Sequence, residues 1–128
     1  MKTEVSTAIE ELKRQFSTSL MTVREDGQGG AYVTLEPVEL GAKFRPAATW
    51  VGFQIPAQYP YADIYPVFIG AGIQRADGVA FQAPVTPGHN FEGRGAIQVS
   101  RRSAAAQNGS QKAVAKILKV LAFLEKLQ

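Results

Sequence analysis

His89, Ser100 and Ser103 are the residues whose types could support group-transfer chemistry in this chain of 128 residues. A serine becomes a nucleophile when a nearby base accepts its proton, and His89 is the only imidazole available for that role. Serine chemistry therefore requires His89 within hydrogen-bond reach of Ser100 or Ser103, which the spacing alone does not establish. Taken by itself, Gly88-His89-Asn90 is typical of a turn with a surface histidine.

Cysteine is absent, which excludes disulfides, thiolate metal sites and a cysteine nucleophile in this sequence. With a single histidine we expect no structural zinc site, and we expect no cofactor. The net charge of +3 is concentrated towards the C-terminus. A basic module that contacts an acidic partner such as nucleic acid is one alternative, but aromatic and basic residues do not interleave there as in RNA-binding domains, so nucleic acid is not favoured. Its surface would comprise Arg94, Arg101, Arg102, Lys112, Lys116 and Lys119.

The length suits a single domain over residues 1–128 with a core of its own. No apolar run approaches the ~20 residues that span a bilayer. The N-terminal stretch carries acidic residues where a signal peptide has its apolar segment. We therefore expect a cytoplasmic protein that does not contact a membrane.

The N-terminal stretch predicts a helix from about Ser6 to Phe16, with Ser6 as its N-cap. Its apolar stripe consists of Val5, Ile9, Leu12 and Phe16, and Lys13 and Arg14 lie on the wet side. A second amphipathic helix is predicted near the C-terminus, capped by Ser110. Its expected apolar face is Val114, Ile117, Leu118, Leu121 and Leu124, with Lys112, Lys116 and Lys119 largely on another face.

Between the helices, alternating apolar residues predict four antiparallel strands in sequential order. The strands are Leu20–Arg24, Ala31–Leu35, Ala48–Ile55 and Val67–Ile69. The last two are joined by a corner that contains Tyr59-Pro60-Tyr61 and ends at Pro66, in which we expect at least one tyrosine ring to be buried with its hydroxyl paired. The connection Pro37–Pro46 and the segment Gly70–Arg94, rich in glycine and proline, are expected to be irregular. The order predicts an α+β fold.

This order and the corner resemble those of ubiquitin-conjugating enzymes (E2 enzymes). Tyr59-Pro60-Tyr61 and Pro66 resemble the family's YPF-x-P-P motif, with one or two extra residues before Pro66. Asn90 corresponds to the asparagine of the family's His-Pro-Asn motif, with His89 in place of the proline. Gln98 then falls at the position of the family's catalytic cysteine, and the neighbouring matches are Gly95, Ile97 and Val99.

The resemblance implies an E2-like fold: an N-terminal helix, a four-stranded antiparallel meander, an irregular segment like the family's active site and a C-terminal helix. Because glutamine cannot form a thioester, the resemblance implies an inactive protein. Such a protein would bind a ubiquitin-like modifier, its E1-like activating enzyme or an active E2 in a bacterial conjugation pathway, and it could also form a homodimer. By resemblance Lys13 and Arg14 would dock the activating enzyme. Further binding candidates are His89, Arg101 and Arg102. The alternative is an active enzyme whose native cysteine has been replaced by Ser100, Ser103 or one of Ala104, Ala105 and Ala106.

Overall fold

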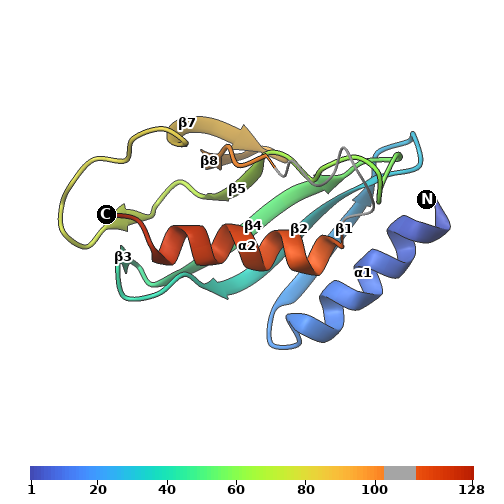
Figure 1. Ribbon diagram of the computed structural model, residues 1–128, viewed down its shortest axis with the longest axis horizontal. Coiled ribbons are helices and arrows are strands. Elements are labelled where there is room, and N and C mark those ends of the chain that lie inside the picture. Colours follow the sequence, from blue (N-terminus) through green and yellow to red (C-terminus); the bar gives the residue numbers. More distant parts are fainter. Residues whose placement is uncertain (103–111) are drawn as a thin grey trace.

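The computed structural model describes residues 1–102 and 112–128, and these form an α+β fold in which a curved sheet carries two helices (Figure 1). The final-helix cap predicted at Ser110 lies outside the described residues. Along the chain the elements are α1 (Thr3–Gln15), β1 (Leu20–Glu25), β2 (Ala31–Glu39), β3 (Phe44–Arg45), β4 (Ala48–Ile55), β5 (Val67–Gly70), β6 (Gln74–Arg75), β7 (Val85–Phe91), β8 (Arg94–Val99) and α2 (Ala113–Glu125).

The main sheet has six strands in the order β1-β2-β4-β5-β8-β7, and every neighbouring pair is antiparallel. Its first four members are the predicted meander, and the antiparallel pairing of β4 with β5 is confirmed by the register Val51 to Ile69. The predicted total of four strands is wrong, because the hairpin β7–β8 adds two more beside β5. A two-stranded ribbon of β3 and β6 completes the fold.

The segment Gly70–Arg94 is not irregular throughout, since it contains β6 and β7. Strand β7 accommodates Pro87 and Gly88 through a register shift between Thr86 and His89. Proline is tolerated there because β7 is an edge strand and its outer side needs no ladder donor. The expected connection Pro37–Pro46 likewise holds the end of β2 and all of β3.

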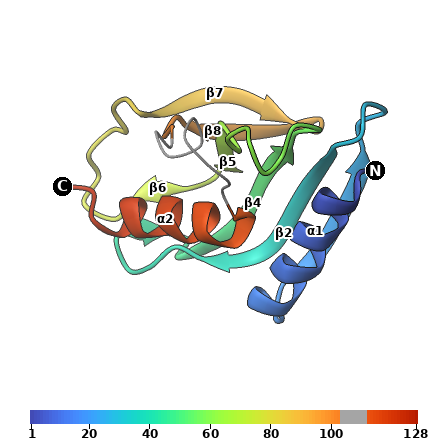
Figure 2. The ribbon, with the colours of Figure 1, turned by 45° about the vertical axis from the view of Figure 1, so that its right-hand side comes forward.

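Both helices cover the same face of the sheet (Figure 2). Helix α1 begins at Thr3, so Ser6 lies within it, and the N-cap is Lys2 without a side-chain cap. Its buried residues match the predicted stripe with Ala8 in addition, while Phe16 is the C-cap. The core between helices and sheet includes Phe53, Ile55, Ile69, Ile97 and Ile117. No helix of the described residues is long and apolar enough to cross a membrane.

Helix α2 is rotated relative to the predicted apolar face. Its buried residues are Ala113, Lys116, Ile117, Val120 and Leu124, which form one stripe at helical spacing. Leu118, expected inside, is 41% exposed, and Lys116, expected outside, is 3% exposed. A lysine therefore occupies a core position of this helix.

A second apolar cluster lies on the opposite face of the sheet, around Phe91 at the end of β7. The Phe91 ring stacks on Phe68 and Trp50, with centroids 5.2 and 6.1 Å apart, and meets Tyr32 edge-on. It also lies against Gly52, where an added Cβ would come within 2.6 Å of the ring. Glycine at this position of β4 thus lets the ring approach the backbone.

The tip of the β7–β8 hairpin reaches back across this face towards the far edge of the sheet. Glu92, in the turn, accepts two hydrogen bonds of 2.9 Å from the guanidinium of Arg24 on β1. Arg94 pairs with Glu36 on β2 at 3.1 Å and lies over the Trp50 ring. These contacts fix the hairpin in place over strands that are remote in sheet order.

The Tyr-Pro corner connects the sheet with α2. The Tyr59 ring is buried, and its hydroxyl accepts a 3.0 Å hydrogen bond from the main-chain N–H of Ala113, the first residue of α2. This N–H has no acceptor within its own helix, so Tyr59 satisfies one of the unpaired donors of the helix start. The expected buried, hydrogen-bonded tyrosine is therefore Tyr59. Tyr61 instead is 72% exposed.

Candidate functional site

The residues matched to the family's active site lie on one hairpin without converging. Asn90 on β7 faces Gly95 of β8, whereas Gln98 faces Thr86 near the other end of β7. Gln98 lies three residues after Gly95 on β8, which at about 3.4 Å per residue corresponds to about 10 Å. Asn90 is exposed and Gln98 is half-buried. An oxyanion donor at Asn90 therefore would not lie beside the Gln98 position.

Ser100 lies just beyond β8, where its main-chain N–H donates to the carbonyl of Pro84 at 2.9 Å. Its hydroxyl accepts a 2.8 Å hydrogen bond from the side-chain amide of Gln98. His89 faces Ala96, four residues earlier on β8, so about 13 Å of strand separates it from Ser100. The register thus does not give Ser100 an imidazole base. Ser103, the other serine considered, lies outside the described residues.

Arg101 and Arg102 extend the chain from β8 as two exposed cations held against aromatic rings. The guanidinium of Arg101 lies 4.5 Å from the ring centroid of Phe123 on α2. The guanidinium of Arg102 lies 4.0 Å from the ring centroid of Tyr65 in the corner. Both contacts keep the cations at the surface while restricting their positions. They form a fixed positive site between α2 and the corner.

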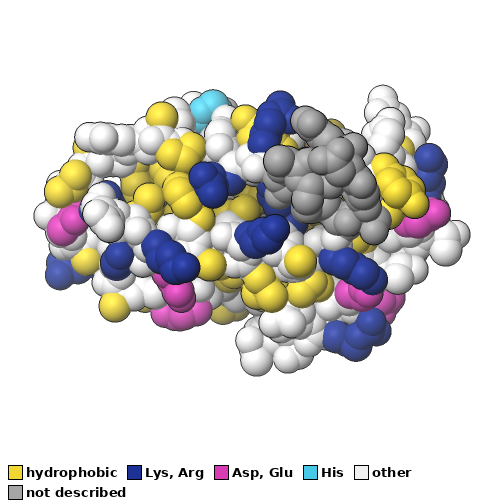
Figure 3. Space-filling model, in the orientation of Figure 1, with side chains coloured by type: hydrophobic (Ala, Val, Ile, Leu, Met, Phe, Trp, Pro, Cys, Tyr) yellow, Lys and Arg dark blue, Asp and Glu magenta, His cyan; other side chains and the backbone are white. Residues whose placement is uncertain are grey.

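The remaining cations of the proposed basic surface are less available. Figure 3 shows Lys and Arg side chains spread over the face that carries α2, with hydrophobic side chains between them. Lys112 pairs with Glu11 at 3.3 Å, and Arg94 pairs with Glu36. Lys116 is buried, and Lys119 is exposed. Acidic partners within the chain therefore offset part of this positive charge.

Lys116, which the sequence pattern placed on a basic surface, is instead part of a buried ion pair. Its ammonium lies 3.1 Å from both carboxylate oxygens of Asp63 in the corner and also donates to the main-chain carbonyl of Arg101. The side chains are 3% and 10% exposed. The pair thus joins three segments: α2, the corner and the chain leaving β8. The available signal was spacing, because position 116 completes the stripe of Ala113, Ile117 and Val120.

A hollow of about 350 Å³ lies between α1 and the Tyr-Pro corner. The corner contributes Pro60 and the exposed ring of Tyr61, while α1 contributes carboxylates and hydroxyls. Lys112 at the start of α2 closes one side through its ion pair with Glu11. The complete lining is Thr3, Glu4, Thr7, Glu11, Tyr59, Pro60, Tyr61 and Lys112. Exposed tyrosine is one of the residue types that are enriched in protein-binding surfaces.

A shallower hollow of about 510 Å³ continues between α1 and α2 on the other side of the Glu11–Lys112 pair. Arg14 and the half-exposed Leu118 line it. Lys13 points elsewhere, with its ammonium 3.4 Å from Glu10 and its side chain 53% exposed. Lys13 and Arg14 are thus both accessible near the end of α1, as a docking role requires.

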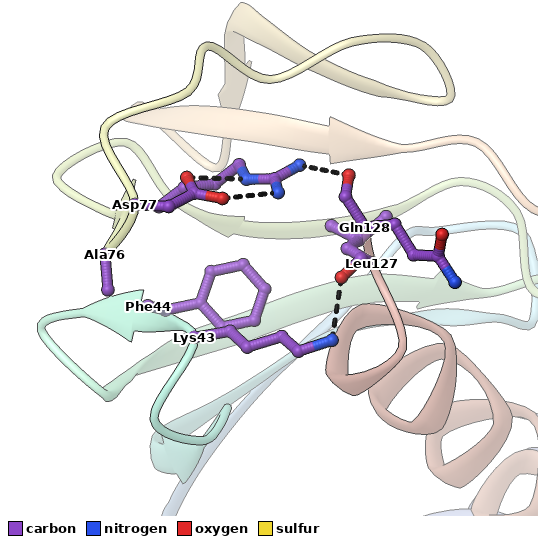
Figure 4. A pocket seen from close by; sticks show the side chains of 7 residues that line it. Lys43, Phe44, Ala76, Asp77, Leu127 and Gln128 are labelled. Carbon is purple, nitrogen blue, oxygen red and sulfur yellow. Dashed lines mark hydrogen bonds and ion pairs between the residues drawn. The ribbon is translucent and has the colours of Figure 1, made fainter.

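A third hollow, of about 300 Å³, lies between the β3–β6 ribbon and the last residues of the chain (Figure 4). Lys43 donates to the main-chain oxygen of Leu127 at 2.7 Å, and Arg75 donates to that of Gln128 at 2.9 Å. Arg75 also makes two hydrogen bonds to Asp77, which, with the main-chain N–H of Val79, hold the pKa of Asp77 below its ordinary value. The hydrogen bonds from Lys43 and Arg75 hold the residues that follow α2 against the ribbon.

Among the described residues, no group of three or more His, Asp or Glu side chains is arranged to hold a metal ion. Comparison of the chain with protein-family models, curated proteins and solved structures gives no match.

Proposed function

We propose that this protein is a catalytically inactive E2-like protein that binds a ubiquitin-like modifier, its activating enzyme or an active E2 in a bacterial conjugation pathway. The observation that carries the proposal is the place of the Tyr-Pro corner. It joins β4 to β5, the last two strands of the meander β1-β2-β4-β5, in a chain with a helix at each end of the element order. The proposal rests on this order together with the residues that resemble the family's motifs.

Binding is favoured over transfer because the chemistry of transfer has no support among the described residues. The sequence contains no cysteine, and the half-buried amide of Gln98 can neither attack a carbonyl nor carry a thioester. Ser100 is separated from His89 by the hairpin register. An E2-like fold with these residues retains surfaces for its partners.

The docking surface that we assign consists of Arg14, Pro60, Tyr61 and Lys112, which line the two hollows beside α1, with the exposed Lys13 next to it in sequence near the end of α1. It combines the accessible cations at the end of α1 with the exposed aromatic ring of Tyr61. Tyrosine and arginine are enriched among residues that contribute most to protein–protein binding. Positive charge at its rim would increase the association rate with an acidic partner surface.

The test is a binding titration against a ubiquitin-like protein, an E1-like activating enzyme and an active E2 of a bacterial conjugation pathway. Wild-type protein should bind at least one of them, and the double variant Lys13→Glu/Arg14→Glu should bind at least about tenfold more weakly. The matched control is Arg45→Glu/Lys126→Glu, which makes the same charge change at exposed positions outside this surface. If both variants weaken binding equally, the cause is the change in net charge and not this surface. Absence of binding to all three proteins would contradict the proposal.

A further inference from the structure

Strand β1 is an edge of the main sheet and carries exposed apolar side chains. It pairs with β2 on one side and is the last strand in the sheet order. Five of its six residues are exposed, among them Leu20 at 74% and Val23 at 36%. An exposed edge of this kind can accept another strand through its main-chain groups.

The two edges of the sheet differ in protection. Strand β7 follows Pro84, contains Pro87 and Gly88, and shifts register between Thr86 and His89. Prolines and bulges are common means of preventing strand addition. Strand β1 contains neither proline nor glycine and pairs with β2 without a register shift. Strand addition is therefore favoured at β1.

The hairpin geometry shows which main-chain groups of β1 face outward. The N–H of Asp26 donates to the carbonyl of Gly30, which makes these two residues a hydrogen-bonded pair in the β1–β2 register. Because such pairs alternate along antiparallel strands, Thr22 and Arg24 bond to β2. Met21 and Val23 then direct their N–H and C=O groups towards the outer edge.

We propose that β1 pairs with β1 of a second copy of this chain, antiparallel, about a two-fold axis at Thr22. In this register the outward groups of Met21 and Val23 bond to those of the partner copy's Val23 and Met21. Thr22 of one copy lies opposite Thr22 of the other. Across the two strands, Met21 packs on Val23 of the other copy, and Leu20 packs on the aliphatic stem of the other copy's Arg24. Threonine pairs and apolar with β-branched pairs stabilise neighbouring strands, and no like charges are opposed.

The chain is self-complementary in this register but not in the next one permitted by the main-chain pattern. A two-fold axis at Val23 would place Met21 opposite Glu25 and Leu20 opposite Asp26, with apolar side chains against carboxylates. A two-fold axis at Met21 would pair only residues 20–22 of each strand, whereas the axis at Thr22 pairs residues 20–24. The occupant that best fits this edge is therefore a second copy with the axis at Thr22. This inference is independent of the proposed function, because it involves no ubiquitin-like partner.

The dimer should dissociate readily. A strand of six residues is about 20 Å long, and pairing along it buries less than the ~1,600 Å² of a standard interface. We therefore expect wild-type protein to change from monomer to dimer between about 5 µM and about 500 µM in sedimentation velocity. Val23→Pro removes one outward N–H and no bond to β2, so it should remain monomeric over that range.

Cross-linking tests the register, because the chain lacks cysteine and each variant carries a single thiol. The Thr22 residues of the two copies would lie opposite each other as a non-hydrogen-bonded pair, and the spacing of such a pair permits a disulfide. Under mild oxidation Thr22→Cys should form at least about tenfold more covalent dimer than Thr86→Cys, an exposed control on β7. Wild-type protein that stays monomeric throughout, or equal cross-linking of the two variants, would overturn the proposal. Stronger cross-linking of Val23→Cys than of Thr22→Cys would overturn the register.

Discussion

Replacing Lys116 by methionine should lower the free energy of unfolding by about 3–5 kcal/mol, the usual cost of removing one partner from a buried ion pair. Three features of the structure support a loss of unfolding free energy of this size. The ammonium is 3% exposed, it contacts both oxygens of Asp63 at 3.1 Å, and it donates to the carbonyl of Arg101. Methionine has a similar length, so the loss should come from charge and hydrogen bonding more than from packing volume.

Urea unfolding measures this effect. With a slope of about 2 kcal/mol per molar urea, the transition midpoint of Lys116→Met should fall by about 1.5–2.5 M. Lys119→Met is the matched control, since Lys119 is exposed on the same helix, and it should change stability by less than about 0.5 kcal/mol. The double variant Lys116→Met/Asp63→Leu should recover much of the loss, because an apolar pair replaces the ion pair. A Lys116→Met midpoint equal to that of the control would refute the buried pair.

Three further changes have expected outcomes. Tyr59→Phe should cost about 1–3 kcal/mol in urea unfolding because the buried N–H of Ala113 loses its acceptor, and an unchanged midpoint would show that this hydrogen bond is dispensable. Gly52→Ala places a methyl 2.6 Å from a phenylalanine ring, so it should destabilise by about 1–3 kcal/mol and shift the emission of the single tryptophan, whereas wild-type emission would contradict the packing. The pKa of Asp26 lies below its ordinary value of 3.8, because its carboxylate accepts hydrogen bonds, first of all from the main-chain N–H of Gln28. The stabilisation that these hydrogen bonds give the folded protein should therefore be complete above pH 3.8 and be lost as the pH falls through the lower pKa of the folded state. Asp26→Asn should reduce this acid-side loss in unfolding measured over a pH series, and an unchanged pH profile would contradict it.

The elements that the sequence predicts best are those with a local periodic signal. Alternation in Ala48–Ile55 and the four-three-four spacing in α1 each place apolar residues on one face, and both elements pack against one core. The Tyr-Pro corner also carries a local signal, because proline restricts the backbone. The pattern did not specify which tyrosine is buried, since that depends on where α2 begins.

The missed features depend on tertiary contacts. Strand β7 contains Pro87 and Gly88, which argue against a strand unless the strand is known to lie at an edge. Lys116 has a charged side chain at a core position, and Asp63, which contacts it, is far away in the sequence. The Phe91 cluster likewise depends on a hairpin that reaches across the sheet.

The candidate site shows the same division. The residues matched by resemblance were found by spacing along the chain, but that spacing did not reveal that Asn90 and Gln98 lie in different parts of one hairpin. The hollow beside Tyr61 combines α1, the corner and the start of α2, so no local pattern could identify it.

The main proposal is that this chain is E2-like and binds partners of a conjugation pathway without carrying the modifier. Its most direct test is incubation with the modifier, activating enzyme and ATP, followed by gels with and without reductant and with and without hydroxide. We expect a non-covalent complex in native gels and no adduct under denaturing conditions, because the chain lacks cysteine. An adduct that resists reductant but is cleaved by hydroxide would contradict it, since that behaviour identifies an oxyester on a serine such as Ser100 or Ser103.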